Sequence, residues 1–291
     1  MKSGKAKGII ALLLTVVLWG SSFPAIKVVV SVIDEVTYTW ARSVFALLGI
    51  FPYIIYYYRR NKPEKEEIIG GLVTGITFSL GLWLQGWGTR FTTASNSAFI
   101  TGLNVVFVHV YEAIVGKEYT LKAFFSLLIS IFGLYLLTRP KGGLGVGELL
   151  VLVGAIFWAA QIILISKFSR SNPIIFTFYE TIPALIFLPL SLMMFPFSLE
   201  KIMCILPVLV YLGLVCGDIA FISQVYGQKW IKPYEVALIF LLEPVFASIF
   251  STIALGERLG LLEILGASLI IVGMTLAVIK INSTRGMKYC L

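Results

Sequence analysis

The chain has 291 residues, of which 58% are hydrophobic and only 13% are charged, and its net charge is +8. Soluble globular domains have about 45–50% apolar and about 25% charged residues, so this composition excludes a soluble domain and indicates a chain that crosses a membrane several times. The basic charge does not indicate a nucleic-acid partner, because the Lys and Arg residues fall in short gaps between apolar segments, where they set membrane orientation.

Ten apolar segments follow one another along the chain, each long enough to cross a bilayer as a helix of about 20 residues. We predict spans at residues 8–30, 36–58, 67–89, 93–115, 120–138, 146–168, 173–195, 204–228, 234–255 and 261–280. The first span follows a basic N-terminus, as in a signal peptide. Its apolar run continues past Trp19 without a small-residue cleavage site, so we predict a retained helix.

The Lys and Arg residues are divided unevenly between the two sides of the predicted bundle. With the N-terminus inside, sixteen lie on the inner side, five lie on the outer side, and Lys27 and Arg42 fall within spans, which accounts for all 23. Cytoplasmic loops are enriched in Lys and Arg. We therefore predict a multi-pass protein of the cytoplasmic membrane with both termini in the cytoplasm.

The two halves of the chain show a weak internal repeat. An offset of 139 residues places Trp19 on Trp158, and an offset of 140 residues places Gly133 on Gly273. Each half holds five spans, and because five is odd the halves must insert in opposite orientations. Inverted repeats of this kind are typical of secondary transporters. We predict an all-α membrane protein in which residues 1–140 and 141–291 form two inverted five-helix repeats.

Ionisable residues within the spans are few, and each is a candidate functional residue because a charge is costly in hydrocarbon. The strongest candidates are Asp218 and Glu243 in neighbouring spans, followed by Glu180 in the seventh span. Lys27 and Arg42 add cations near the outer side. The alternative for the carboxylates is a packing role with hydroxyl or amide partners. The alternative for the two cations is that they reach out to the interface.

Asp218 and Glu243 are predicted to lie at similar depth near the midplane, because their two helices run in opposite directions. Two carboxylates in one low-dielectric cavity titrate as a pair. We therefore expect the two residues to act as one unit, with the proton as a candidate coupling ion. Cations near the outer side and carboxylates near the midplane also suit a zwitterion such as an amino acid.

Aromatic and small polar residues complete the candidate site. Trp19 and Phe23 are four residues apart with Ser22 between them, and such aromatic residues suit a cavity for an apolar or aromatic substrate; the alternative is helix packing or anchoring at the membrane interface. The full set of predicted substrate-binding residues is Trp19, Ser22, Phe23, Arg42, Trp83, Trp158, Glu180, Asp218 and Glu243.

The sequence does not favour an enzyme. It has one His, no Cys/His spacing typical of a metal site and no phosphate-binding loop, and no paired base and nucleophile can be assembled from it. We therefore predict no catalytic residues, no cofactor and no bound metal. A passive channel is a closer alternative, but it would need rings of like residues or a filter sequence, neither of which is visible.

Several short motifs, taken in order, resemble EamA-type members of the drug/metabolite transporter superfamily. They are WGSSF at 19–23, WAR at 40–42, TASNSA at 93–98, FWA at 157–159, EPVF at 243–246, LGERL at 255–259 and GASLIIVG at 266–273. The resemblance covers nearly the whole chain, although Asn104 stands where the family has a proline in the first half. It implies ten helices in a 5+5 inverted repeat around a central substrate cavity, and transport of small metabolites, often amino acids and often outward.

Together these observations predict a secondary transporter that works by alternating access in the lipid bilayer. Amino acids or related zwitterions are the predicted substrates, export is the predicted direction, and no nucleic-acid partner is expected. The alternatives are a passive facilitator or channel, and a transporter of nucleosides, sugars or cationic drugs.

Overall fold

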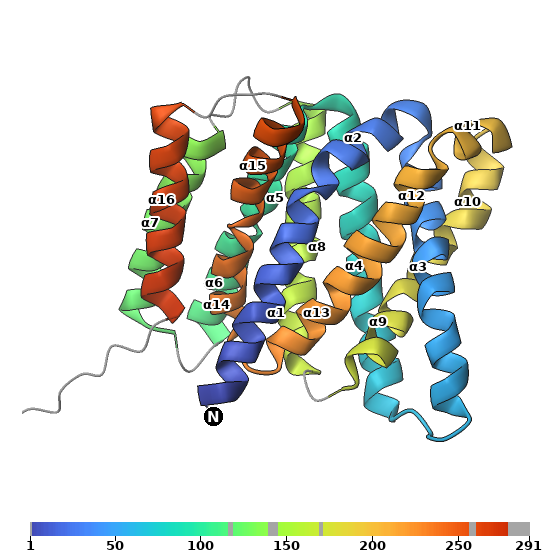
Figure 1. Cartoon of the computed structure of the whole chain (residues 1–291), viewed down its shortest axis with the longest axis horizontal. Helices are drawn as coiled ribbons and strands as arrows, with labels where there is room; N and C mark the ends of the chain where they lie inside the picture. Colours follow the sequence, from blue (N-terminus) through green and yellow to red (C-terminus); the bar gives the residue numbers. More distant parts are fainter. Residues whose placement is uncertain (1, 116–118, 139–144, 169–170, 256–259, 279–291) are drawn as a thin grey trace, which may run out of the picture.

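The computed structural model describes residues 2–115, 119–138, 145–168, 171–255 and 260–278. These parts of the chain are helical apart from short turns and connections, and Figure 1 shows them as one helical bundle. The Gly116-Lys117-Glu118 segment and most of the LGERL motif lie outside the described residues.

The prediction of ten membrane-spanning helices is confirmed. Among the described residues, the helical segments that are long and apolar enough to cross a membrane are Gly4–Val32, Glu35–Tyr58, Lys65–Phe91, Asn96–Val115, Leu121–Thr138, Val146–Lys167, Pro173–Met194, Leu206–Gln228, Pro233–Phe250 and Leu261–Val278. Helices suit a bilayer because they pair their backbone N–H and C=O groups internally.

Several of these spans consist of more than one helix. In chain order the helices are α1 (Lys2–Gly20), α2 (Ser22–Val32), α3 (Glu35–Tyr58), α4 (Lys65–Phe91), α5 (Ala94–Gly102), α6 (Asn104–Val115), α7 (Leu121–Thr138), α8 (Val146–Lys167), α9 (Pro173–Thr181), the 3-10 helix η1 (Ile182–Ile186), α10 (Phe187–Met194), α11 (Leu199–Cys204), α12 (Leu206–Gly213), the π-helix η2 (Leu214–Ile219), α13 (Ala220–Gln228), α14 (Pro233–Phe240), α15 (Glu243–Leu255) and α16 (Leu261–Val278).

The α4 helix is the packing centre of the part of the bundle that also contains α8 and α9. Glycines bring these three helices into backbone contact. A Cβ on Gly88 would lie 2.5 Å from the carbonyl oxygen of Gly147 in α8, and a Cβ on Gly75 would lie 2.4 Å from that of Glu180 in α9. Small residues allow such close approach between helices in a membrane.

The α7 and α16 helices pack chiefly against each other, and Figure 1 shows them side by side at one edge of the bundle. Gly133 and Gly266 lie at their crossing, where a Cβ on Gly266 would be 2.5 Å from the Gly133 carbonyl oxygen. Only Gly266, Ile270 and Gly273 of α16 are buried, and its other side chains are partly or fully exposed. This helix pair therefore leaves an apolar outer surface that suits contact with lipid.

The fourth and ninth spans are both interrupted near their middles. The α5 helix ends at Gly102 and α6 starts at Asn104, while α14 ends at Phe240 and α15 starts at Glu243. The residue that follows each first helix has almost the same backbone conformation, with φ −66° and ψ −7° at Leu103 and φ −64° and ψ −9° at Leu241. Irregular backbone at this depth persists only where protein or a cavity surrounds it.

Pro244 explains only one of the two interruptions. It occupies the second position of α15, where its missing N–H has no helical partner to lose. The α6 helix begins without a proline. Aligning the two spans by where their second helix begins places Asn104 on Glu243. Aligning them by the sequence motifs instead places Asn104 at the position of the family's proline. A polar residue therefore stands at the start of the second helix in both interrupted spans.

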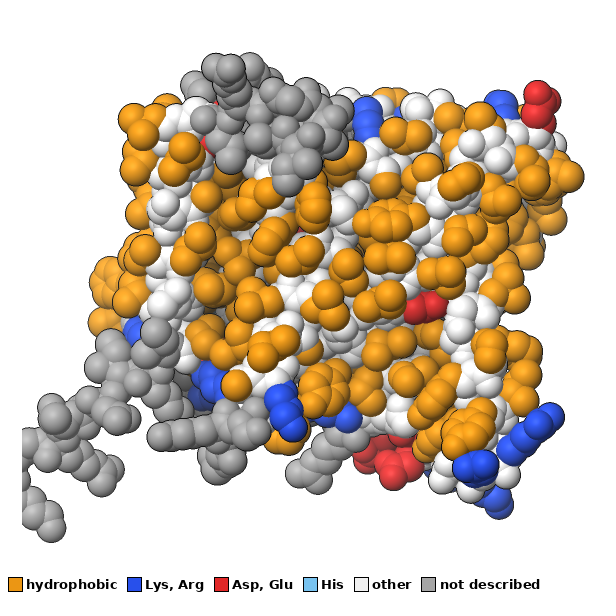
Figure 2. Space-filling model, viewed as in Figure 1, with side chains coloured by type: hydrophobic (Ala, Val, Ile, Leu, Met, Phe, Trp, Pro, Cys, Tyr) orange, Lys and Arg blue, Asp and Glu red, His pale blue; other side chains and the backbone are white. Residues whose placement is uncertain are grey.

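Charged residues gather at the two ends of the bundle. Figure 2 shows hydrophobic side chains over the middle of the visible face, with Lys and Arg concentrated at the end where Figure 1 places the N-terminus. At that end Lys5 donates to the Glu235 carboxylate and to the Val278 carbonyl oxygen, each at 3.0 Å. At the opposite end Arg90 pairs with Glu35 at 2.8 Å.

The charge distribution makes a prediction about membrane orientation. Asn61 and Lys201 are exposed and lie at opposite ends of the bundle, in the α3–α4 connection and in α11. In a cysteine-free background, Asn61→Cys should react with an impermeant maleimide only from the cytoplasmic side, and Lys201→Cys only from outside. Labelling of intact cells and of inverted vesicles measures this. Reaction of Asn61→Cys in intact cells would contradict the N-in orientation.

Candidate functional site

A pocket lies in the middle of the bundle, beside both interrupted spans. Seven of the ten spans contribute to it. Its lining residues are Trp19, Ser22, Ile26, Arg42, Leu82, Gln85, Thr101, Asn104, Trp158, Gln161, Ile162, Phe221, Phe240 and Glu243. The empty space among them, open solvent included, is about 490 Å³, and little of it is wide enough for a water molecule. A substrate as large as an amino acid therefore requires these side chains to move apart.

Aromatic rings form one wall of the pocket. The Trp19 ring centre lies 4.9 Å from that of Phe221, 5.1 Å from that of Phe240 and 6.4 Å from that of Trp158. These separations are typical of tilted and edge-to-face aromatic pairs. The Trp19 indole also donates to the Cys216 carbonyl oxygen at 3.1 Å, which holds the ring in place. The wall offers a preformed apolar surface to a substrate.

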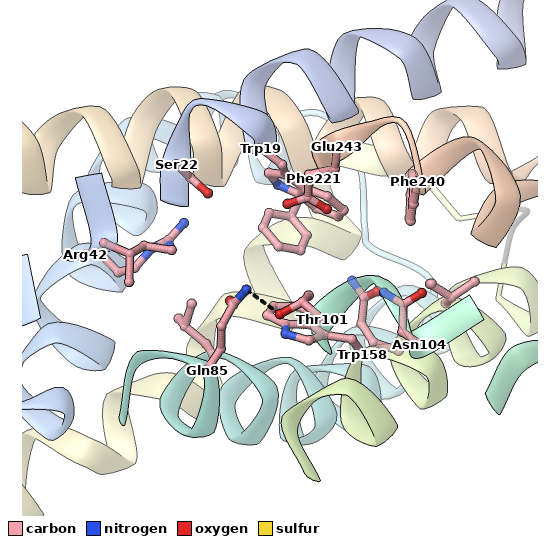
Figure 3. A pocket seen from close by; sticks show the side chains of 14 residues that line it. Trp19, Ser22, Arg42, Gln85, Thr101, Asn104, Trp158, Phe221, Phe240 and Glu243 are labelled. Carbon is pink, nitrogen blue, oxygen red and sulfur yellow. Dashed lines mark hydrogen bonds between the residues drawn. The ribbon is translucent and has the colours of Figure 1, made fainter. Parts of the chain in front are cut away.

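Arg42 provides a positive charge at one end of the pocket (Figure 3). It comes from α3 and is only 5% exposed. Its guanidinium donates to the Tyr38 hydroxyl at 2.8 Å and to the Leu212 carbonyl oxygen at 2.9 Å. These two hydrogen bonds hold the guanidinium in position. Among the described residues it forms no ion pair, so its remaining N–H donors are available to a substrate carboxylate.

Glu243 provides a negative charge beside the aromatic wall. It is the first residue of α15, and Figure 3 shows its carboxyl group next to Phe221 and Trp19. A Cβ on Gly20 would lie 3.0 Å from the Glu243 carbonyl oxygen, so α1 packs tightly against the start of α15. In the described part of the structure the Glu243 side chain has no ion-pair partner. A half-buried carboxylate within a membrane span, unpaired in this way, favours a cationic ligand group.

Uncharged polar residues line the rest of the pocket, and sequence analysis did not include them in the predicted site. The Gln85 amide donates to the Thr101 hydroxyl at 3.2 Å. The Asn104 side-chain oxygen is buried without a hydrogen-bond partner among the described residues. Asn, Gln and Thr cost less than charges in a membrane, so they stand out less in an apolar sequence. Asn104 is distinguished in the structure by its position, because it is the first residue of the second helix in an interrupted span.

The structure brings five of the nine predicted residues to this pocket: Trp19, Ser22, Arg42, Trp158 and Glu243. The other four lie elsewhere. Phe23 is buried in helix packing, and Trp83 stacks on Trp87 with ring centres 5.2 Å apart. Glu180 is 1% exposed and reaches the pocket only through the Gln161 amide, which donates to it at 2.8 Å.

Asp218 and Glu243 are not brought together. Asp218 lies in the π-helical segment η2 and points toward α3, where a Cβ on Gly49 would be 2.4 Å from its Oδ2 atom. Glu243 instead lines the pocket. The sequence predicted a shared depth for the two residues, but their side chains face different neighbours: Asp218 faces Gly49 of α3, and Glu243 faces the pocket. The structure therefore does not support a carboxylate pair at the site.

Lys27 also differs from the sequence-based expectation. Its ammonium group donates to the carbonyl oxygens of Thr89 and Thr92 at 2.8 and 2.7 Å, and of Arg90 at 3.2 Å. Those carbonyls belong to the C-terminal end of α4, where a cation satisfies unpaired acceptors and the helix dipole. Lys27 therefore caps a helix and does not line the pocket.

The described residues contain no group of three His, Cys, Asp or Glu side chains that could hold a metal ion. The pocket instead combines one cation, one carboxylate, several amides and an aromatic wall. Such a set can bind a small polar molecule by charge and hydrogen bonding and can release it again.

Comparison with known proteins places this architecture in a family. Residues 6–139 and 145–279 each match the model of the EamA-like transporter family. The chain belongs to the EamA-like transporter family. This assignment makes the protein a membrane transporter with a small-molecule substrate.

Individual relatives agree with this assignment over nearly their full lengths. An uncharacterized transporter of Archaeoglobus fulgidus is 28% identical over 96% of this chain and 90% of its own. The uncharacterized transporter YdfC of Bacillus subtilis is 24% identical over 91% of this chain and 89% of its own. A crystal structure with 13% sequence identity superposes with a TM-score of 0.76 over 94% of this EamA-like chain and 96% of that chain, which shows a shared fold.

Proposed function

We propose that this transporter exports apolar or aromatic amino acids, or related zwitterions, across the cytoplasmic membrane by alternating access. The observation that carries the proposal is that one pocket contains a positive side chain, a negative side chain and an aromatic wall. Arg42 is positioned to hold a carboxylate, Glu243 is positioned to hold an ammonium group, and the Trp19 cluster is positioned to hold an apolar side chain. Nucleosides and sugars lack this pair of charges.

Alternating access is supported by the form of the two interrupted spans. Each is broken into two helices beside the pocket, at Leu103 and at Leu241, and discontinuous helices beside a binding site are typical of transporters that work by alternating access. We propose that residues 1–140 and 141–291 act as two inverted repeats that rock about this centre. The narrow space between the pocket side chains favours a carrier that opens and closes over a continuously open channel.

Purified protein in proteoliposomes tests the substrate class. We expect exchange of L-phenylalanine across the membrane, with radiolabelled phenylalanine entering vesicles preloaded with the unlabelled amino acid. Trp158→Ala should slow this exchange by about tenfold or more, because the aromatic wall loses a buried ring worth at least about 1.5 kcal/mol. Trp87→Ala, a tryptophan of α4 outside the pocket lining, is the matched control and should exchange at the wild-type rate.

A thermal-shift panel with the detergent-purified protein covers the alternatives. A specific ligand raises the melting temperature by mass action. Stabilisation by phenylalanine or leucine but not by nucleosides, sugars or cationic dyes is the expected result. Stabilisation by a cationic dye alone would refute the zwitterion and leave Glu243 as the recognition group for a cation.

A further inference from the structure

Glu180 is a buried carboxyl group that the substrate pocket does not use directly. It lies near the end of α9 and is 1% exposed. One of its oxygens, Oε1, accepts a hydrogen bond from the Gln161 amide at 2.8 Å. The other, Oε2, is buried with no hydrogen-bond partner among the described residues. A carboxylate held in this way inside a membrane protein lacks the partners that a permanent charge requires.

No charged group in the described structure neutralises Glu180. The helices and turns packed against α9 are α3, α4, α13 and η1. The titratable residues near α9 on these elements are Tyr53, Tyr57 and Tyr58 of α3, Glu67 of α4 and Tyr226 of α13. None of them forms an ion pair or hydrogen bond with Glu180, and Tyr179 of α9 itself bonds to Tyr58 instead. Glu180 is thus isolated from other charges.

A proton is the cation that best fits this site. Hard metal cations take about six or more oxygen ligands. Glu180 supplies only two oxygens. Its hydrogen-bond partner, the Gln161 amide, presents its nitrogen to the carboxyl group and therefore adds no oxygen ligand. A proton needs only one carboxyl oxygen, and it removes the charge whose burial is costly.

A chain of glutamines connects this carboxyl group to the pocket. Gln161 lines the pocket, and its amide donates to both Glu180 and Gln224, the latter at 3.1 Å. Gln224 donates back to Gln161 and on to Gln228, each at 2.9 Å. Gln228 completes the chain by donating to the Ser166 hydroxyl at 2.8 Å. Because each amide fixes the orientation of the next, a change in the charge of Glu180 alters the group that Gln161 presents to the pocket.

We propose that Glu180 is a proton-binding site, separate from the substrate pocket and coupled to it through Gln161. This proposal rests on the proposed function. A zwitterion bound with its carboxylate at Arg42 and its ammonium group at Glu243 lies in the pocket that Gln161 also lines. A nearby positive charge stabilises an ionised carboxyl group, so substrate binding releases the proton from Glu180. The substrate and the proton therefore move in opposite directions.

The two other carboxyl groups that the sequence placed in the candidate site, Glu243 and Asp218, suit this role less well. Glu243 lines the pocket and is positioned to contact the substrate itself. Asp218 points toward α3, the helix that carries the Arg42 cation, and it has no hydrogen-bonded link to the pocket among the described residues. Glu180 alone combines isolation from charge with a direct hydrogen bond to a pocket residue.

Infrared difference spectroscopy tests the proton site without any substrate. Spectra of the purified protein recorded between acidic and alkaline pH should contain a protonated-carboxyl band that disappears in Glu180→Gln and remains in Asp218→Asn. Identical difference spectra for wild type and Glu180→Gln would overturn the proposal. This measurement stands even if phenylalanine proves not to be a substrate, so it separates failure of this proposal from failure of the proposed function.

Transport tests the coupling. Proteoliposomes that are acidic inside should accumulate L-phenylalanine above the level of equal-pH vesicles, because protons leave as the amino acid enters. Glu180→Gln should lose this accumulation and keep phenylalanine exchange at equal pH, which requires no net proton movement. Accumulation by Glu180→Gln equal to wild type would overturn the proposal, as would wild-type accumulation driven by a sodium gradient and not by a pH gradient.

Discussion

Glu243→Gln should weaken binding of L-phenylalanine by roughly 30-fold or more. The substitution keeps the shape of the side chain and removes the charge that faces the substrate ammonium group. Removing one partner of a buried charge pair costs about 2–5 kcal/mol, and each 1.4 kcal/mol is a factor of ten in the dissociation constant. Scintillation proximity binding to the detergent-purified transporter measures the change directly.

A matched pair of ligands separates the charge of Glu243 from its effect on pocket shape. 3-Phenylpropionate carries the carboxylate and the ring of phenylalanine but has no ammonium group. Its affinity should be similar in wild type and in Glu243→Gln. An equal loss of affinity for both ligands would mean that Glu243 supports the start of α15 and does not recognise the ammonium group.

Gly88→Ala should destabilise the transporter by about 1–3 kcal/mol, because overpacking of a tight interface costs that much. The added Cβ would lie 2.5 Å from both the Gly147 carbonyl oxygen and the Val151 side chain in α8. Backbone cannot move away as a flexible side chain can. The α4 and α8 helices, which pack extensively against each other, must therefore separate. The midpoint temperature for loss of the monodisperse peak after heating in detergent measures the effect.

Gly154→Ala is the matched control for this interface. Gly154 lies on α8 and faces α4, but the nearest atoms to an added Cβ are at 3.4 Å, an ordinary van der Waals contact. Alanine is also the better helix former by about 1 kcal/mol. The midpoint temperature of Gly154→Ala should therefore equal or exceed that of the wild type. Equal losses in both variants would show that helix separation does not limit the stability of the bundle.

The amino-acid sequence by itself determined the membrane class, the ten spans and the family. Bilayer thickness requires about 20 apolar residues for each helix, so the length of an apolar run is sufficient to identify a span wherever it packs. The EPVF motif at 243–246 and the tryptophans at 19 and 158 were recognisable for a similar reason. A carboxylate, a proline or a large ring in an apolar span carries a cost that marks it.

Only the tertiary structure decided which marked residues meet in one pocket. Residue counting predicts a similar depth for Asp218 and Glu243, but Asp218 lies in the π-helical segment and faces Gly49 of α3 and not the pocket. Lys27 finds its partners at the end of α4, more than sixty residues along the chain. Depth follows from counting residues along a span. The direction of a side chain follows from how neighbouring helices pack, so Gln161 and Asn104 joined the site only when the helices were brought together.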